Sequence, residues 1–278
     1  MTPPLVLMYH SVIPYDHDPY LVTVSPLRLD RQFTWLRRQG LRGVSMRELL
    51  AARDRGAAQG LVGLTFDDGY ADFADYVLPA LRRHRFTATV FVIAGRLGGG
   101  NDWDPEGPRK PLMTADQVRQ VAAEGVEIGS HGMWHRSLPG LSSDTLVAET
   151  ASSRAVLRDL SGQNVTGFCY PYGDLSAPTV ERVRAAGYDY GCAIWRSALT
   201  GRLALPRTYV GDDDTGPRLW AKRLRHWIVS RSSANPATAN PTSHVPAGSV
   251  PAQRPVQNVP TTSVTGNPMP RETEESHP

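Results

Sequence analysis

Short apolar runs alternate with longer amphipathic segments along most of this chain. The apolar runs, which predict buried strands, are PLVLMYH, GLVGLTF, TATVFVIAG, GVEIGSH, TGFCYPYG and YDYGCAIW. The segments ADFADYVLPALRRH, TADQVRQVAAEG, SSDTLVAETASSRAVLRDLSG and APTVERVRAAG instead carry apolar residues at helical spacing. Repeated strand-then-helix units predict an α/β fold with parallel strands and outer helices, either a barrel or an open doubly wound sheet.

Residues at the ends of the amphipathic segments predict where helices begin and end. Thr114 and Ser143 are candidate N-caps, because a hydroxyl oxygen can accept a hydrogen bond from the first helical turn. Gly125, Gly162 and Gly187 are candidate stops, because glycine readily adopts the left-handed conformation that ends many helices.

A basic helix is predicted over residues 217–231, PRLWAKRLRHWIVSR. It has two faces, an apolar one with Leu219, Trp220, Leu224, Trp227 and Ile228 and a basic one with Arg218, Lys222 and Arg225. One interpretation is docking on the rest of the fold, and the other is peripheral contact with an anionic membrane surface. The preceding Asp212, Asp213 and Asp214 indicate either a turn with a helix N-cap or a metal cluster.

The composition changes sharply near residue 231. From there to Pro278 the chain has no aromatic residue, no Leu and no Ile, but nine of its 23 prolines. Such a segment buries too little apolar surface to offset the entropy lost on ordering. We therefore expect a folded domain over residues 1–230 and a disordered tail over 231–278.

Composition and charge narrow the function. The chain has 278 residues, 40% of them hydrophobic, which is enough for a core of enzyme size. The net charge of only +3 argues against nucleic acid as a partner. Cys169 and Cys192 lie in apolar runs and are expected to be reduced core residues. We see no signal peptide and no apolar run of about 18 residues, so we expect a cytoplasmic protein.

Two neighbouring aspartates, Asp67 and Asp68, follow the apolar run LVGLTF. The carboxyl ends of buried parallel strands are where α/β folds place ligands and catalytic groups. Adjacent carboxylates repel each other unless a cation or a proton satisfies at least one of them. The alternative interpretation is a turn at the strand end with solvated aspartates.

His131 follows the apolar stretch VEIGS, and His135 comes four residues later. Side chains four residues apart on one turn project from the same side, so both imidazoles could reach one metal ion. Together with one carboxylate they would form a three-ligand set that leaves a position for water. Surface or packing histidines are the alternative.

Three ordered motifs carry a resemblance. TFDDGY at residues 65–70, SHGMWH at 130–135 and YPYG at 170–173 are similar to the motifs of the polysaccharide deacetylase family, also called the NodB-homology domain or carbohydrate esterase family 4. YHSV near the start and LPR at residues 205–207 extend the likeness. The resemblance implies a distorted (β/α) barrel of about seven strands and a metal-dependent N-deacetylase acting on a carbohydrate that carries an N-acetyl group.

The resemblance also implies roles for single residues. Asp68, His131 and His135 would hold a divalent metal ion, with zinc as the first expectation, and Asp67 would be the general base. The backbone N–H of Tyr172 would help to bind the oxyanion.

The chain departs from the family pattern at two positions. Many members have an arginine before the third motif, where this chain has Phe168 and Cys169, and many have a catalytic histidine in the last motif, where it has Arg207. Arg207 is our candidate to replace the missing arginine as partner of Asp67. His10 in MYHSV is our candidate general acid, with a structural hydrogen bond as the alternative.

Two other functions stay open on the residues alone. The first is a metal-dependent amidohydrolase for small non-sugar amides or imides, and the second is a carbohydrate-binding barrel without activity. Trp134, between the two histidines, could stack on a sugar ring or simply pack.

Overall fold

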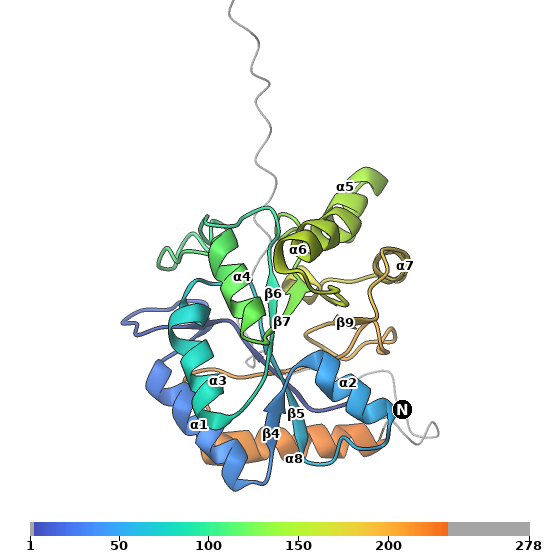
Figure 1. Ribbon diagram of the computed structural model, residues 1–278. Helices are drawn as coiled ribbons and strands as arrows, with labels where there is room; N and C mark the ends of the chain where they lie inside the picture. Colours follow the sequence, from blue (N-terminus) through green and yellow to red (C-terminus); the bar gives the residue numbers. More distant parts are fainter. Residues whose placement is uncertain (1–2, 233–278) are drawn as a thin grey trace, which may run out of the picture.

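The computed structural model describes residues 3–232, and parallel strands form the centre of that part of the chain (Figure 1). Seven strands follow one another in the order β10-β1-β5-β6-β7-β8-β9, and β4 also pairs with the first half of β5. These strands are β1 (Val6–Tyr9), β4 (Arg42–Val44), β5 (Leu61–Phe66), β6 (Thr89–Val92), β7 (Glu127–Ser130), β8 (Gly167–Cys169), β9 (Tyr190–Cys192) and β10 (Thr208–Tyr209). A separate parallel pair joins β2 (Ser11–Val12) to β3 (Thr23–Val24).

Helices surround this sheet (Figure 1). They are α1 (Pro26–Arg38), α2 (Met46–Asp54), α3 (Leu78–His84), α4 (Ala115–Ala123), α5 (Ser143–Val147), α6 (Ser153–Ser161), α7 (Ala177–Ala185) and α8 (Gly216–Ser232). Two π-helical segments, η1 (Phe73–Val77) and η2 (Ala148–Ser152), continue directly into α3 and α6, and a short 3₁₀ turn, η3 (Pro171–Gly173), follows β8.

The sheet curls into half a barrel, which confirms the α/β fold and the distorted barrel of about seven strands. The segment before β10 hydrogen-bonds the end of β9, since the N–H of Leu205 donates to the Gly191 carbonyl at 2.8 Å and that of Ala193 to the Leu205 carbonyl at 2.8 Å. Because β10 pairs with β1, one short segment links the two ends of the strand order.

Alternate strand residues pack on the two faces of the sheet, as expected for a side-chain period of two. Val90 and Val92 of β6 join the large outer core under the helices, whereas Phe91 joins a smaller inner cluster with Cys169 and Tyr190. Helix α2 contributes to this inner cluster through Met46, Leu49 and Leu50. The inner face is therefore filled by side chains except where polar groups come together at the carboxyl ends of the strands.

Most predicted helix limits match the structure, and one is wrong. Thr114 accepts from the N–H of Gln117 in a reciprocal capping box, and Gly125, Gly162 and Gly187 all have positive φ. The predicted cap Ser143 is instead the first residue of α5, because Ser142 has the extended backbone of an N-cap and its hydroxyl accepts from the N–H of Thr145.

Helix α8 forms where it was predicted. Leu219 is buried and Lys222 donates to the Tyr209 carbonyl at 2.7 Å, so the helix docks on the barrel. Trp220 and Trp227 remain about half exposed, and contact with a membrane surface stays a prediction. No helix within residues 3–232 is both long and apolar enough to span a bilayer. The predicted tail lies outside the described residues, apart from residues 231 and 232 at the end of α8.

The three aspartates before α8 form a turn. Asp212 accepts from the N–H and hydroxyl of Ser25, both at 2.7 Å, and Asp214 accepts from the N–H of Gly211 at 2.8 Å. None of the three belongs to a group of possible metal ligands within the described residues. The two cysteines, Cys169 and Cys192, are buried and unbonded to each other, as predicted for reduced core residues.

Candidate functional site

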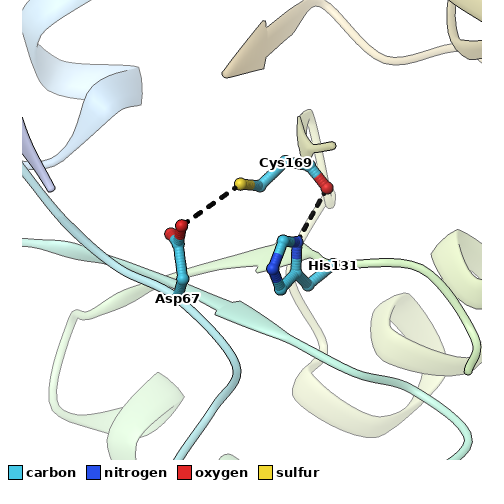
Figure 2. Close-up of side chains that lie close together, drawn as sticks. All are labelled: Asp67, His131 and Cys169. Atoms are coloured by element: carbon cyan, nitrogen blue, oxygen red, sulfur yellow. Dashed lines mark hydrogen bonds between the residues drawn. The ribbon is translucent and has the colours of Figure 1, made fainter. Parts of the chain in front are cut away.

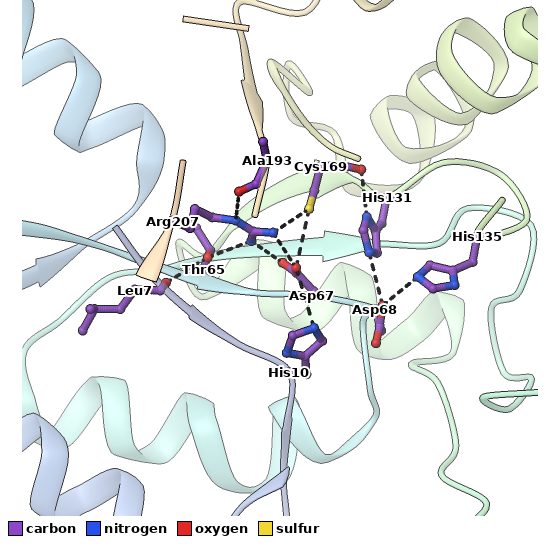
Figure 3. Close-up of polar contacts among 10 residues, drawn as sticks. All are labelled: Leu7, His10, Thr65, Asp67, Asp68, His131, His135, Cys169, Ala193 and Arg207. Carbon is purple, nitrogen blue, oxygen red and sulfur yellow. Dashed lines mark hydrogen bonds and ion pairs between the residues drawn. The ribbon is translucent and has the colours of Figure 1, made fainter. Parts of the chain in front are cut away.

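The polar residues singled out in the sequence come from several strand ends and meet at one place (Figure 3). Asp67 and Asp68 follow β5, and His131 follows β7. His10 lies between β1 and β2, and Arg207 immediately precedes β10. In a parallel sheet the carboxyl ends of the strands lie at one edge, so residues far apart in the sequence come together there.

Asp68, His131 and His135 form a compact set of possible metal ligands. Oδ1 of Asp68 lies 3.2 Å from Nε2 of His131 and 3.3 Å from Nε2 of His135. Ligand atoms bound tetrahedrally at about 2.1 Å from a zinc ion would lie about 3.4 Å apart. All three side chains are buried, and neither Asp68 oxygen makes a hydrogen bond of good geometry within residues 3–232. The set therefore fits a divalent cation.

Neighbouring groups orient the two imidazoles. Nδ1 of His131 is 2.8 Å from the Cys169 carbonyl oxygen, which leaves Nε2 directed at Asp68. The ring of His135 lies between two aromatic rings, with its centroid 4.4 Å from that of Trp103 and 4.6 Å from that of Tyr172. Both histidines are thus held in fixed orientations before a cation binds.

Glu149 of η2 holds the loop that carries the histidines. Its Oε2 accepts from the N–H of Met133 at 2.7 Å and from the N–H of Trp134 at 3.1 Å. The side chain is fully buried, and this burial raises the pKa of Glu149. A hydrogen-bonding carboxylate here fixes the spacing between His131 and His135.

Three residues of the site have left-handed backbone. φ is +70° at Asp68 and +59° at both His135 and Tyr172, and these are three of five such non-glycine residues in the described part of the chain. A side chain in this conformation costs about 1 to 2 kcal/mol, because its Cβ approaches the backbone. Such strain is typical of functional positions.

Arg207 forms a bidentate ion pair with Asp67. Nη1 of Arg207 lies 2.6 Å from Oδ1 of Asp67, and Nη2 lies 2.7 Å from Oδ2. The same guanidinium donates to the Ala193 carbonyl at 3.1 Å and to the Thr65 hydroxyl at 3.0 Å. Burial alone would raise the pKa of Asp67, but the charge and hydrogen bonds of Arg207 hold it below its usual value. The carboxylate is therefore ionised and fixed in direction.

His10 lies on the other side of Asp67. Its Nε2 is 3.9 Å from Oδ2 of Asp67, and its Nδ1 is buried with no partner within residues 3–232. Burial lowers the pKa of His10, although the charges of Asp67 and Asp68 oppose this shift. The structure therefore brings His10 to the site without a hydrogen bond that would make it purely structural.

A second set of possible ligand atoms, from Asp67, His131 and Cys169, shares this region (Figure 2). It fits a cation less well, because each group already has another contact. Asp67 is paired with Arg207, and Sγ of Cys169 accepts from Nη2 of Arg207 at 3.0 Å. Burial raises the pKa of the Cys169 thiol, which keeps it protonated. A guanidinium this close also repels a cation, so Asp68 with the two histidines is the better site.

Sequence reasoning missed several residues of the site. Glu149 and Trp103 lie in segments with no recognisable motif, and only the folded chain brings them against the histidine loop. Thr65 is the first residue of the TFDDGY motif, but its bond to Arg207 depends on how the strands pair. The N–H of Tyr172 lies in a left-handed turn next to His135. Trp134 is 44% exposed, so its ring is available for contact with a ligand.

Comparisons with known proteins show which proteins this chain resembles. A family model described as polysaccharide deacetylase matches residues 54–191, the range from just before β5 to β9. The matched range contains Asp67, Asp68, His131 and His135, whereas His10 lies before it.

Two curated relatives and one solved structure extend the likeness. YxkH, a candidate polysaccharide deacetylase of Bacillus subtilis (strain 168), is 27% identical over 216 residues, which cover 76% of this chain and 72% of that protein. The poly-beta-1,6-N-acetyl-D-glucosamine N-deacetylase of Staphylococcus aureus (strain MRSA252) is 22% identical over 204 residues, 69% of each chain. The structure of the Streptococcus pyogenes deacetylase PplD in complex with acetate shares the fold, with a TM-score of 0.68 and 24% identity over 79% of this chain and 97% of that one.

Proposed function

Because this chain belongs to the polysaccharide deacetylase family, whose members hydrolyse carbon–nitrogen bonds, we propose that it is a metal-dependent N-deacetylase acting on an N-acetylated amino sugar or polysaccharide. The observation that carries the proposal is the arrangement of Asp68, His131 and His135 around one point, with the ionised Asp67 beside them. A carbohydrate-binding protein without catalytic activity would need neither an ionised general base nor a set of metal ligands that leaves a position for water.

Two imidazoles and one carboxylate suit zinc, which is the cation we propose for this site. A divalent cation held there would polarise the amide carbonyl and lower the pKa of water. The ligand set leaves a coordination position open, as a catalytic site requires. The two imidazoles are neutral ligands, so Asp68 supplies the only negative charge among the three.

The remaining steps fall to residues of the chain. Asp67, fixed by Arg207, accepts a proton from the attacking water. The N–H of Tyr172 donates a hydrogen bond to the carbonyl oxygen as negative charge develops on it. His10 then donates a proton to the amine nitrogen, since an amine leaves only in protonated form. The charges of Asp67 and Asp68 favour the protonated imidazole that this step needs, against the effect of burial on the pKa of His10. The C–N bond breaks, acetate is released, and the sugar keeps a free amine.

The substrate class is part of the proposal. The Staphylococcus aureus relative is named for poly-beta-1,6-N-acetyl-D-glucosamine, which supports a polymer or oligomer of an N-acetylated amino sugar. An identity of 22% is too low to transfer the β-1,6 linkage of that polymer to this chain, so we propose the class of substrate and not one polymer. A small non-sugar amide is the second candidate, because the metal site recognises the amide alone.

Acetate release from zinc-loaded protein tests both candidates. We expect release from N-acetylglucosamine oligomers, loss of release after chelation and recovery when zinc is returned. The control is the Asp68→Asn variant treated in the same way. Release from simple acetamides with none from any amino sugar would overturn the proposal in favour of the second candidate.

A further inference from the structure

The loop between β6 and α4, residues 93–114, forms one wall of the site. It packs in a small apolar cluster of its own, made of Tyr70, Ile93, Trp103 and Leu112 and separate from the main core. Two contacts join it to the residues just before η1. They are a bridge between Tyr70 and Leu112 and a hydrogen bond from the Ala71 N–H to the Pro111 carbonyl at 2.9 Å. Through Trp103 the same loop covers the ligand candidate His135.

Asn101 fixes the middle of this loop. Its Oδ1 accepts from the N–H of Lys110 at 2.7 Å, and its Nδ2 donates to the Pro108 carbonyl at 3.2 Å. The N–H of Asp104 donates to the Asn101 carbonyl at 3.1 Å, and the Asp104 carbonyl accepts from the N–H of Gly107 at 3.2 Å. The backbone of Asp104 is therefore held on both sides, and its side chain has a defined position.

The carboxylate of Asp104 is buried without a partner. Asp104 is 1% exposed, and within residues 3–232 neither of its oxygens accepts a hydrogen bond. The indole N–H of Trp103 also lacks a partner in that range. An unpaired carboxylate taken out of water costs several kcal/mol, so a fold keeps one only where something else satisfies it.

Asp104 directly follows Trp103, whose ring packs against that of His135, so it lies near the metal-ligand side of the site. Burial, followed by the charge of Asp68, raises the pKa of Asp104 to about 7, and the charge of Asp104 in turn acts on Tyr172. A neighbouring cation, Lys110, has its ammonium bonded to the Thr23 hydroxyl. Asp104 belongs to neither group of possible metal ligands in the described chain, so a cation held by Asp68 and the two histidines would not satisfy its oxygens.

We propose that Asp104 is a specificity-determining residue that accepts hydrogen bonds from ring hydroxyl groups of the sugar carrying the amide. This inference rests on the proposed function and deepens it. Two acceptor oxygens on one rigid group match neighbouring hydroxyl donors on a sugar ring, and such charge-assisted bonds are the stronger kind. The unpaired indole N–H of Trp103 adds one hydrogen-bond donor beside it. A bare acetamide has no hydroxyl to offer and would gain nothing from Asp104.

Zinc-loaded full-length wild type, Asp104→Asn and Asp104→Ala are to be compared on two substrates. One is the N-acetylglucosamine tetramer, and the other is 4-nitrophenyl acetate, which carries the acetyl group without a sugar. Calorimetric binding of the glucosamine tetramer, which is not turned over, and zinc content are measured alongside. Asp102→Asn is the matched control, because Asp102 lies on the same loop but is exposed and paired with Arg96 and Arg109.

We expect kcat/KM on the tetramer and affinity for glucosamine tetramer to fall about 10- to 100-fold in the Asp104 variants, as for the loss of a hydrogen bond to a charged group. Ester hydrolysis should stay within about twofold, with zinc content unchanged, and Asp102→Asn should match wild type. Equal losses on both substrates, or loss of zinc, would assign Asp104 to the metal centre and overturn the inference. Unchanged kinetics and affinity would also overturn it.

The two proposals fail in different ways. If the wild type binds the glucosamine tetramer but releases no acetate from the N-acetylglucosamine tetramer, the deacetylase proposal is refuted. Weaker binding of the glucosamine tetramer by the Asp104 variants would still support the sugar contact. If wild type and Asp104→Ala deacetylate the N-acetylglucosamine tetramer at the same rate, the proposed function stands and the role of Asp104 is removed. A wild type with no affinity for the tetramer counts against the sugar contact directly.

Discussion

The guanidinium of Arg207 meets the carboxylate of Asp67 through two parallel contacts, Nη1 to Oδ1 at 2.6 Å and Nη2 to Oδ2 at 2.7 Å. Both side chains are almost fully shielded from solvent, so the pair is little screened. The two residues are 140 positions apart, and the pair joins the segment before β10 to the end of β5. One ion pair thus both orients the proposed base and links two strands.

Arg207→Lys should lower kcat about 10- to 100-fold with little change in zinc content, because an ammonium cannot make the two parallel bonds. Arg207→Ala should also destabilise the fold by about 3 to 5 kcal/mol, since it leaves a buried carboxylate unpaired. Steady-state kinetics and urea unfolding measure the two effects. Full activity in Arg207→Lys would show that orientation of Asp67 does not depend on the guanidinium.

His10→Ala should slow amide hydrolysis by about 10²- to 10⁴-fold, the usual contribution of a general acid. Activated aryl acetates should be much less affected, because their leaving group needs no proton. The ratio of the two rates is the measurement. An equal loss on amide and ester would leave His10 a structural or binding role.

Asp68→Asn should reduce zinc content of the purified protein to a small fraction of one equivalent, since the amide removes the only negative charge among the three ligands. Asp67→Asn is the matched control, because it changes the neighbouring carboxylate and should keep the metal while losing turnover. Metal analysis after dialysis distinguishes them. Zinc retained by Asp68→Asn and lost by Asp67→Asn would favour the alternative ligand set with Cys169.

Asp72 makes stability depend on pH in a predictable direction. Burial raises the pKa of Asp72 from 3.8 to about 6, although its Oδ2 accepts from the Ser11 hydroxyl at 2.6 Å. As pH rises from about 4 to about 6, the unfolded chain ionises first, so the wild type loses stability over that window. Asp72→Asn avoids this loss and should gain on the order of 2 to 3 kcal/mol relative to wild type between pH 4 and pH 7.

Urea unfolding of both proteins at several pH values measures this difference. Asp144→Asn, at an exposed position in the first turn of α5, is the control. A difference between Asp72→Asn and wild type that stays constant from pH 4 to pH 7 would contradict the prediction.

Removal of the segment after Ser232 should leave both the melting temperature and acetate release unchanged. The reason is its composition, which offers no Leu, Ile or aromatic side chain for a core. Thermal unfolding and the acetate assay on the shortened chain provide the check. A drop of several degrees, or loss of most activity, would reveal a docking role for this segment.

The strand ends that carry the site could be predicted because each is a strongly apolar run followed directly by ionisable residues. The likeness to known motifs then supplied the pairing of Asp68 with His131 and His135. Glu149 and Asp104 could not be predicted, because their environment is created by a loop and a π-helical segment that meet only in the folded chain.

Parts of the fold were missed for different reasons. The first two helices, α1 and α2, were overlooked although Leu29, Phe33 and Leu36 are spaced for one helical face. The short strands β4 and β10 have three and two residues, too few to show a period of two. Their existence depends on pairing with β5 and β1, which is a property of the tertiary fold.

The left-handed backbone at Asp68, His135 and Tyr172 sets stability against activity in this protein. Glycine or asparagine adopts that conformation at lower cost, so replacing any of these residues relieves strain while removing a ligand or a ring that positions one. Selection of a mutant library for heat resistance alone would therefore enrich such replacements and yield proteins that are more thermostable but inactive. Engineering a thermostable form should hold these three positions constant and look for its gains elsewhere.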